Sequence, residues 1–156
     1  MGFEYFYGFV GGDASQWQPN LFRNTTAIYP FRGNPGWNLE TAMADEAIGY
    51  IKQLKEIAPG KPWLVYYVPG ATHAPHHVPK EWADKYKGKF DAGWDKLREE
   101  TIARQKALGA IPPDCQLTAR HKEIPAWDAM PEDLKPVLRR QMEVYAGFLE
   151  YTDHHV

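Results

Sequence analysis

Three of the six histidines of this 156-residue chain lie together in the hexapeptide THAPHH at residues 72–77. Imidazole can move a proton near neutral pH, contact an anion or bind a metal. The run therefore has three interpretations: a zinc site, a catalytic or anion-binding histidine in a loop, and a structural or solvent-exposed cluster. Zinc needs three or four ligands, but no acidic residue is close by and Pro75 disfavours a helical face of histidines. A position just after an apolar run favours the second interpretation.

The other chemically capable residues are less informative. Cys115 is the only cysteine, so it forms no internal disulfide, and no neighbouring base would activate it as a nucleophile. His154 and His155 fit a packed or solvated helix end, His121 fits the surface, and Asp13 in Gly-Gly-Asp fits a turn. The sequence contains no glycine-rich phosphate loop, no G-x-S-x-G and no paired-cysteine motif. The histidine run is thus the strongest candidate site.

The elements around the histidine run have an α/β pattern. Residues 39–57 are predicted to form a helix that is capped by Asn38 and ended by Pro59-Gly60. Its apolar stripe consists of Leu39, Met43, Ala47, Ile51 and Leu54. Residues 62–68 read PWLVYYV, which predicts a strand covered on both faces. Residues 71–79 would then follow the carboxyl end of that strand, where ligands of open α/β sheets bind.

The remaining chain is predicted to be loop-rich first and helical later. Short strands are expected around Tyr5–Val10 and Thr26–Phe31. Helices are expected over 79–86, 92–108 and from about 133 to the end. The predicted organisation is a loop-rich lead-in (1–37), a unit of helix, buried strand and His loop (38–79), and a helical region (80–156).

Composition narrows the class of protein. The chain is 44% hydrophobic and 24% charged with a net charge of −2, as in a soluble globular protein that binds no nucleic acid. No apolar run is long enough for a membrane span, and the first residues do not resemble a signal peptide. These observations indicate no membrane partner and leave the compartment open between bacterial cytoplasm and periplasm.

Five stretches resemble the bacterial arylsulfatases, in order and with matched spacing over essentially the whole chain. They are GFEYFYGFVGGD at 2–13, QWQPNLF at 16–22, TAMADEAI at 41–48, WLVYYVPGATHAPHH at 63–77, and the ending from 141 to 154. The resemblance implies an α/β fold: part of an alkaline-phosphatase-like mixed sheet flanked by helices, incomplete in this chain. It also implies hydrolysis of sulfate esters with calcium and a formylglycine made from Cys or Ser in C/S-x-P-x-R.

The same resemblance implies roles for two histidines. His73, in His-x-Pro, matches the family histidine that contacts the sulfate near the ester oxygen, so its implied roles are hydrogen-bond donor and proton donor to the leaving alcohol. His76 is a further candidate for substrate contact, although a rim or structural role suits it better, as it does His77. No metal ligand of the family falls within residues 1–156.

Several family features are absent from the sequence. No C/S-x-P-x-R occurs, since Cys115–Arg120 lacks the proline and has the wrong spacing. The paired aspartates and the Asp-Asn metal pair are also missing. The chain is therefore expected to be a middle segment of a sulfatase catalytic domain, inactive alone and prone to self-association, whose complete protein acts on a sulfate ester. The alternatives are a non-catalytic binding or scaffold homologue and an independent metal hydrolase.

Overall fold

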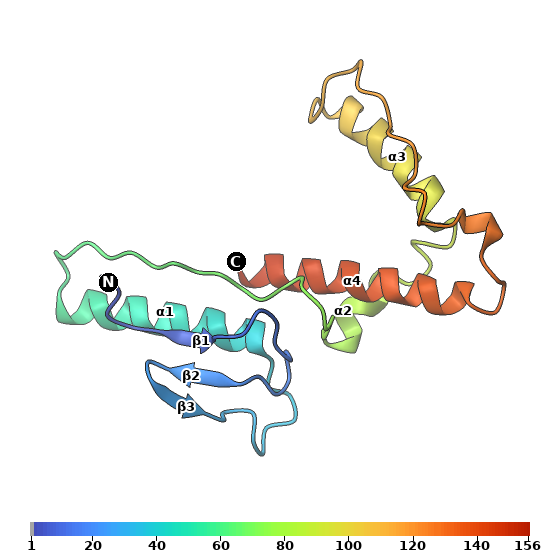
Figure 1. Cartoon of the computed structure of the whole chain (residues 1–156). Helices are drawn as coiled ribbons and strands as arrows, with labels where there is room; N and C mark the ends of the chain where they lie inside the picture. The colour runs from blue at the N-terminus through green and yellow to red at the C-terminus, as the bar shows by residue number, and fades with distance from the viewer. Residues whose placement is uncertain (1) are drawn as a thin grey trace.

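A small antiparallel sheet and four α-helices make up the fold in the computed structural model, which describes residues 2–156 (Figure 1). Helix α1 lies along the sheet, α4 lies beside the short α2, and α3 projects away from both. The chain is thus a mixed α/β structure, as the sequence predicts. The sheet within the described residues, however, has three strands, and both of its pairings are antiparallel.

The strands are β1 (Tyr7–Phe9), β2 (Leu21–Arg23) and β3 (Thr26–Ile28), paired in that order. Asn24 has a φ of 53° in the tight turn between β2 and β3, a left-handed conformation that asparagine tolerates better than most residues. Strands β1 and β3 fall inside the predicted strands. Strand β2 was not predicted, because three residues between turn signals are too short for an alternating pattern.

Helix α1 spans Leu39–Ile57, and its predicted cap is confirmed because the Asn38 side chain accepts the Glu40 amide at 2.9 Å. The helix lies against the sheet through its first turns. Around this contact the buried core consists of Leu21, Leu39 and Met43. The capped end of α1 is therefore fixed to the sheet.

Three further helices follow, close to their predicted ranges: α2 (Lys80–Asp84), α3 (Gly93–Ala107) and α4 (Lys135–His155). A single 3-10 turn, Trp127–Ala129, packs against the start of α3. None of the described helices combines the length and apolarity that a membrane crossing requires. Helix α2 packs closely on α4. The loop that carries the histidines ends where α2 begins, so this packing fixes one end of the loop.

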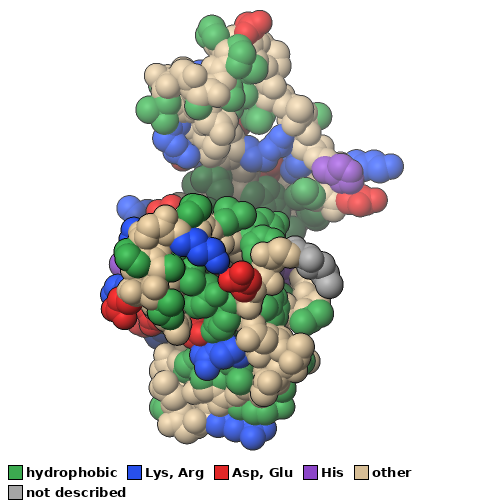
Figure 2. All heavy atoms as spheres, turned by 90° about the vertical axis from the view of Figure 1, so that its left-hand side faces the viewer, with side chains coloured by type: hydrophobic (Ala, Val, Ile, Leu, Met, Phe, Trp, Pro, Cys, Tyr) green, Lys and Arg blue, Asp and Glu red, His purple; other side chains and the backbone are tan. Residues whose placement is uncertain are grey.

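The predicted buried strand at 62–68 is wrong. The segment is extended but pairs with no strand of residues 2–156, and Leu64 and Tyr66 are each 78% exposed. Only Val65 and Tyr67 are half-buried, so one side faces α1 and the other faces solvent. An apolar run predicts burial, but a strand also needs a neighbour to satisfy its N–H and C=O groups. Figure 2 shows hydrophobic side chains exposed on the face of the molecule onto which the C-terminal end of α1 opens.

Candidate functional site

The histidines lie in the loop 71–79, between the extended segment and α2. A turn starts the loop, since the His73 amide donates to the Gly70 carbonyl at 3.1 Å. The Thr72 hydroxyl then donates to the Tyr145 hydroxyl of α4 at 3.0 Å. The loop is thereby held from both sides, by its own turn and by α4.

His73 is exposed, and one of its ring nitrogens is occupied. Its Nδ1 lies 2.7 Å from the Ala74 carbonyl oxygen. A carbonyl can only accept, so Nδ1 carries the proton and Nε2 is the free atom. In the neutral ring Nε2 can only accept, and in the imidazolium it donates. The loop thus presents His73 Nε2 to solvent as its reactive atom.

His76 and His77 contact different parts of the molecule. The His76 ring packs edge-to-face on Tyr145 with 5.1 Å between centroids. The His77 ring stacks on Trp17 at 6.5 Å, and its Nδ1 lies 3.5 Å from the Ser15 hydroxyl. Within residues 2–156, no three His, Cys, Asp or Glu side chains are grouped so that they could hold a metal ion. Nothing here supports an independent zinc site built on this loop.

A buried carboxyl group lies close to the base of the loop. Glu40, the second residue of α1, is fully buried and neither carboxylate oxygen has a hydrogen-bond partner. Burial raises its pKa from the ordinary 4.5 to about 7, and the nearby Ala71 amide offsets this only in part. The Tyr67 hydroxyl and Gln16 Oε1 are likewise buried and unpaired.

Sequence reasoning missed Glu40. An acidic residue in the first turn of a helix is common, because it interacts favourably with the helix dipole. This preference accounts for a glutamate at position 40 whether or not its side chain is buried. Only the packing of the extended segment over the start of α1 shows that the carboxyl is inaccessible to water.

His155 has a structural place at the end of α4. Its Nε2 lies 3.1 Å from the Thr41 hydroxyl of α1, which also bonds the Tyr151 hydroxyl. Burial and the neighbouring His154 both lower the pKa of His155. The packed-helix-end interpretation of His155 therefore fits the structure.

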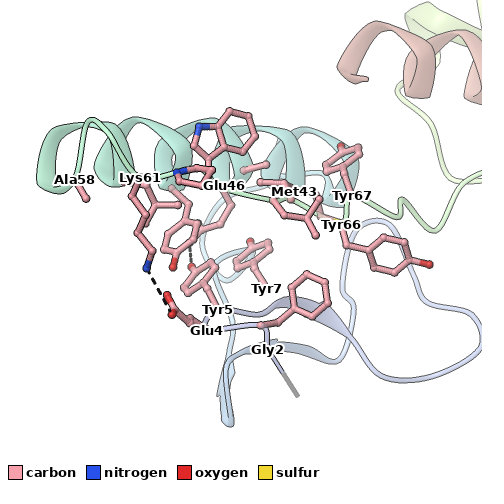
Figure 3. A pocket seen from close by; sticks show the side chains of 18 residues that line it. Gly2, Glu4, Tyr5, Tyr7, Met43, Glu46, Ala58, Lys61, Tyr66 and Tyr67 are labelled. Carbon is pink, nitrogen blue, oxygen red and sulfur yellow. Dashed lines mark hydrogen bonds and ion pairs between the residues drawn. The ribbon is translucent and has the colours of Figure 1, made fainter.

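A cavity of about 440 Å³ lies between the N-terminal segment, α1 and the extended segment (Figure 3). Its walls are rich in aromatic side chains, and its charged lining residues are Glu4, Glu46 and Lys61. Glu46 accepts a hydrogen bond from Tyr5 and pairs with Arg23 at 2.9 Å. Burial raises the pKa of Tyr7 in its wall to about 12. No histidine lines this cavity, so it is separate from the His loop.

A larger groove of about 1000 Å³ opens between α3 and α4, and His76 lies in its wall. Its remaining lining is almost entirely apolar or aromatic and comes from α3, α4 and Phe90. This groove and the His loop therefore share a boundary. Together they form the part of the described chain where a reactive side chain and a ligand-sized space meet.

An exposed histidine with Nδ1 already hydrogen-bonded, in a loop of an α/β structure, can contact an anion through Nε2. The family model described as Sulfatase matches residues 1–156. The chain belongs to the sulfatase family, whose members hydrolyse sulfate esters.

Two curated relatives agree with this assignment. An arylsulfatase from Klebsiella aerogenes is 27% identical over 165 aligned positions, covering 99% of this chain and 34% of that protein. An uncharacterized sulfatase from Schizosaccharomyces pombe is 33% identical over 107 positions, covering 68% of this chain and 19% of that protein. The chain thus spans about a third or less of the relatives that it matches.

Sulfatases generally use calcium and formylglycine, but the side chains present here do not fit either group. No cluster of three potential ligands exists among residues 2–156. Cys115 lies in the loop after α3, where its amide donates to the Pro112 carbonyl at 3.2 Å, and Figure 1 shows that loop on the projecting arm, away from the His loop. Residues 2–156 therefore hold no grouped set of metal ligands, and their cysteine lies away from the His loop.

Proposed function

We propose that this chain is the part of a sulfatase catalytic domain that supplies the sulfate-binding and proton-donating histidine, His73. The observation that carries the proposal is the bond from His73 Nδ1 to the Ala74 carbonyl. It fixes which nitrogen faces outward, so the free Nε2 is oriented for a substrate before any substrate binds. The match of the whole chain to the sulfatase family supports the same role.

His73 would act as a cation in this role. With Nδ1 already donating, Nε2 donates a hydrogen bond to a sulfate oxygen only in the imidazolium form. A nucleophile from outside residues 2–156 would form the new bond to sulfur. As the S–O bond to the alcohol breaks, the alcohol oxygen keeps the electron pair and takes the proton from Nε2. His73 is then neutral and must regain a proton before the next turnover. The positive charge also stabilises the negative charge that develops on the leaving oxygen.

The first prediction concerns turnover. In an active sulfatase that contains residues 1–156, His73→Ala should lower kcat/KM at least 100-fold for a substrate with a poorly activated alcohol. The loss should be much smaller for 4-nitrophenyl sulfate, because 4-nitrophenoxide leaves with little help from a proton donor. Rates are measured over a series of alcohols of different acidity, with His121→Ala, an exposed histidine of another loop, as the control.

Two results would contradict this role. A loss below about tenfold for all substrates would mean that His73 contributes little to the transition state. An equal loss for every alcohol would mean that His73 binds the sulfate but donates no proton.

The isolated 156-residue chain should show no hydrolysis of 4-nitrophenyl sulfate above background.

A non-catalytic binding or scaffold role is the alternative, and the aromatic cavity of about 440 Å³ favours it. Aromatic walls suit sugar or aryl ligands as well as simple packing. The alternative requires a stable, monomeric chain and a complete protein that hydrolyses no sulfate ester. Sedimentation of the purified chain, together with the kinetics above, separates the two functions.

A further inference from the structure

A cluster of buried polar side chains lies beside the first turn of the His loop. Gln16, Asn38 and Glu40 are exposed by 1%, 2% and 0%, and the hydroxyl of the half-buried Tyr67 is also shielded from solvent. Gln16 Oε1, Asn38 Nδ2, the Tyr67 hydroxyl and both Glu40 carboxyl oxygens have no hydrogen-bond partner within residues 2–156. Buried polar atoms are nearly always paired, because an unpaired one loses its bonds to water without replacement. So many unpaired atoms therefore call for an explanation beyond packing.

This cluster adjoins the backbone of the turn that opens the His loop. Burial raises the pKa of Glu40, and the Ala71 amide is close enough to lower it in part. A Cβ added to Gly70 would lie 3.4 Å from Gln16 Nε2, so the Gly70 backbone packs against the same cluster. The Gly70 carbonyl in turn accepts the His73 amide at 3.1 Å. The buried polar groups thus lie next to the turn that ends at His73.

We propose that Glu40 is a positioning residue of the His loop: its carboxyl group holds the turn from Gly70 to His73 through the Ala71 N–H and so sets the orientation of the His73 ring. The hold on the loop rests on the buried cluster alone, and only its effect on turnover rests on the proposed function. A neutral carboxyl accepts from the Ala71 amide and donates to an unpaired acceptor such as Gln16 Oε1. A carboxylate donates to nothing and adds a buried charge, which favours opening of the turn to water. The turn is therefore held best while Glu40 is protonated.

The hold on the loop should weaken as the pH rises through 7. Burial raises the pKa of Glu40 to about 7, so the neutral form is present below that pH. Burial also raises the pKa of Tyr67 to about 12 and the pKa of Tyr151 in α4, and the charge of Glu40 adds to the rise in both. Burial and His154 lower the pKa of His155 at the end of α4, so this ring is neutral near pH 7. Glu40 is thus the group among these whose ionisation changes between pH 6 and pH 8.

The test measures exchange of the Ala71 amide with solvent by NMR in the complete 156-residue chain. Glu40→Gln keeps an acceptor and a donor, as in the neutral carboxyl, whereas Glu40→Met keeps the side-chain length and removes both. At pH 6 the wild type and Glu40→Gln should protect the amide equally, and Glu40→Met should protect it at least about tenfold less. Between pH 6 and pH 8 the protection factor should fall in the wild type and stay constant in Glu40→Gln. Glu46→Met is the control and should change nothing, because Glu46 bonds Tyr5 and Arg23, outside the loop.

Turnover gives a readout that a general loss of stability would not produce. In an active sulfatase that contains residues 1–156, Glu40→Met should lower kcat at least about tenfold for an ester of a poorly activated alcohol. The loss should be small for 4-nitrophenyl sulfate, because its leaving group needs little help from an oriented His73. Glu40→Gln should keep nearly the full rate with both esters. An equal loss for both esters in Glu40→Met would show a general structural effect and overturn the positioning role.

The exchange results decide the positioning role separately from the chemistry of His73. Unchanged Ala71 protection in Glu40→Met, an equal loss in Glu46→Met, a loss in Glu40→Gln at pH 6, or the same pH dependence in the wild type and Glu40→Gln would each overturn it. If Glu40→Met does not fold, the comparison of pH dependence between the wild type and Glu40→Gln decides. A full rate in His73→Ala would remove the proposed function, while exchange of the Ala71 amide would still test the hold of Glu40 on the loop.

Discussion

Gly147→Ala is expected to lower the free energy of unfolding by about 2 kcal/mol or more, as overpacked sites do. A Cβ at this position of α4 would lie 2.7 Å from the Cα and N of Ala83 in α2. Those are backbone atoms, which cannot rotate aside as a side chain would. Helices α2 and α4 would have to separate, and their contact is the most extensive one between helices in this chain.

A glycine in the other long helix provides the control. Gly49 of α1 is exposed, and a Cβ there would meet nothing within 4 Å. Gly49→Ala should therefore raise the free energy of unfolding by about 0.5–1 kcal/mol, because alanine is the better helix former. Urea unfolding followed by circular dichroism measures both variants. If Gly147→Ala were as stabilising as Gly49→Ala, the close packing of α2 on α4 would be wrong.

Glu40→Gln is expected to stabilise the fold at pH 8 by up to about 3 kcal/mol and to leave it nearly unchanged at pH 4. The carboxyl of Glu40 has its pKa raised by burial from 4.5 to about 7. Below pH 4.5 the group is protonated in both the folded and the unfolded chain, so it costs nothing. As the pH rises from 4.5 to 7 the unfolded chain releases the proton first, which favours unfolding. Above pH 7 the full cost is present, and glutamine removes it.

The measurement is the urea midpoint of wild-type and variant chains between pH 4 and pH 8. The wild type should lose stability across the window from 4.5 to 7 relative to the variant, and the two curves should run parallel above it. Glu56→Gln changes an exposed carboxylate on the same helix and should shift stability by less than about 0.5 kcal/mol. Parallel curves over the whole range would show that Glu40 is ionised in the folded chain and paired, with the Ala71 amide as the nearest candidate.

The long helices were predicted well because their signals are local. Helix α1 occupies the predicted range 39–57, since the cap at Asn38, the apolar spacing and Pro59-Gly60 all act within a few residues of one another. The helix predicted from about residue 133 is likewise present as α4, with Pro136 in its first turn, where a missing N–H is harmless. The segment 62–68 was predicted wrongly because strand pairing depends on a second, distant segment, and residues 2–156 do not provide one.

The sequence by itself determined the α/β class, the sulfatase family and His73 as the candidate catalytic residue. The α/β class follows from residue types and spacing along the chain, whereas the family and the role of His73 follow from the resemblance to the bacterial arylsulfatases. The tertiary structure decided which His73 nitrogen is free, where His76 and His77 turn, that Glu40 is buried, and that an apolar groove adjoins the His loop. The physical reason is that these features depend on contacts between residues far apart in the sequence. The hydrogen bond that holds the loop joins Thr72 to Tyr145, and the hydrophobic spacing within one helix does not predict which distant residue will bond to it.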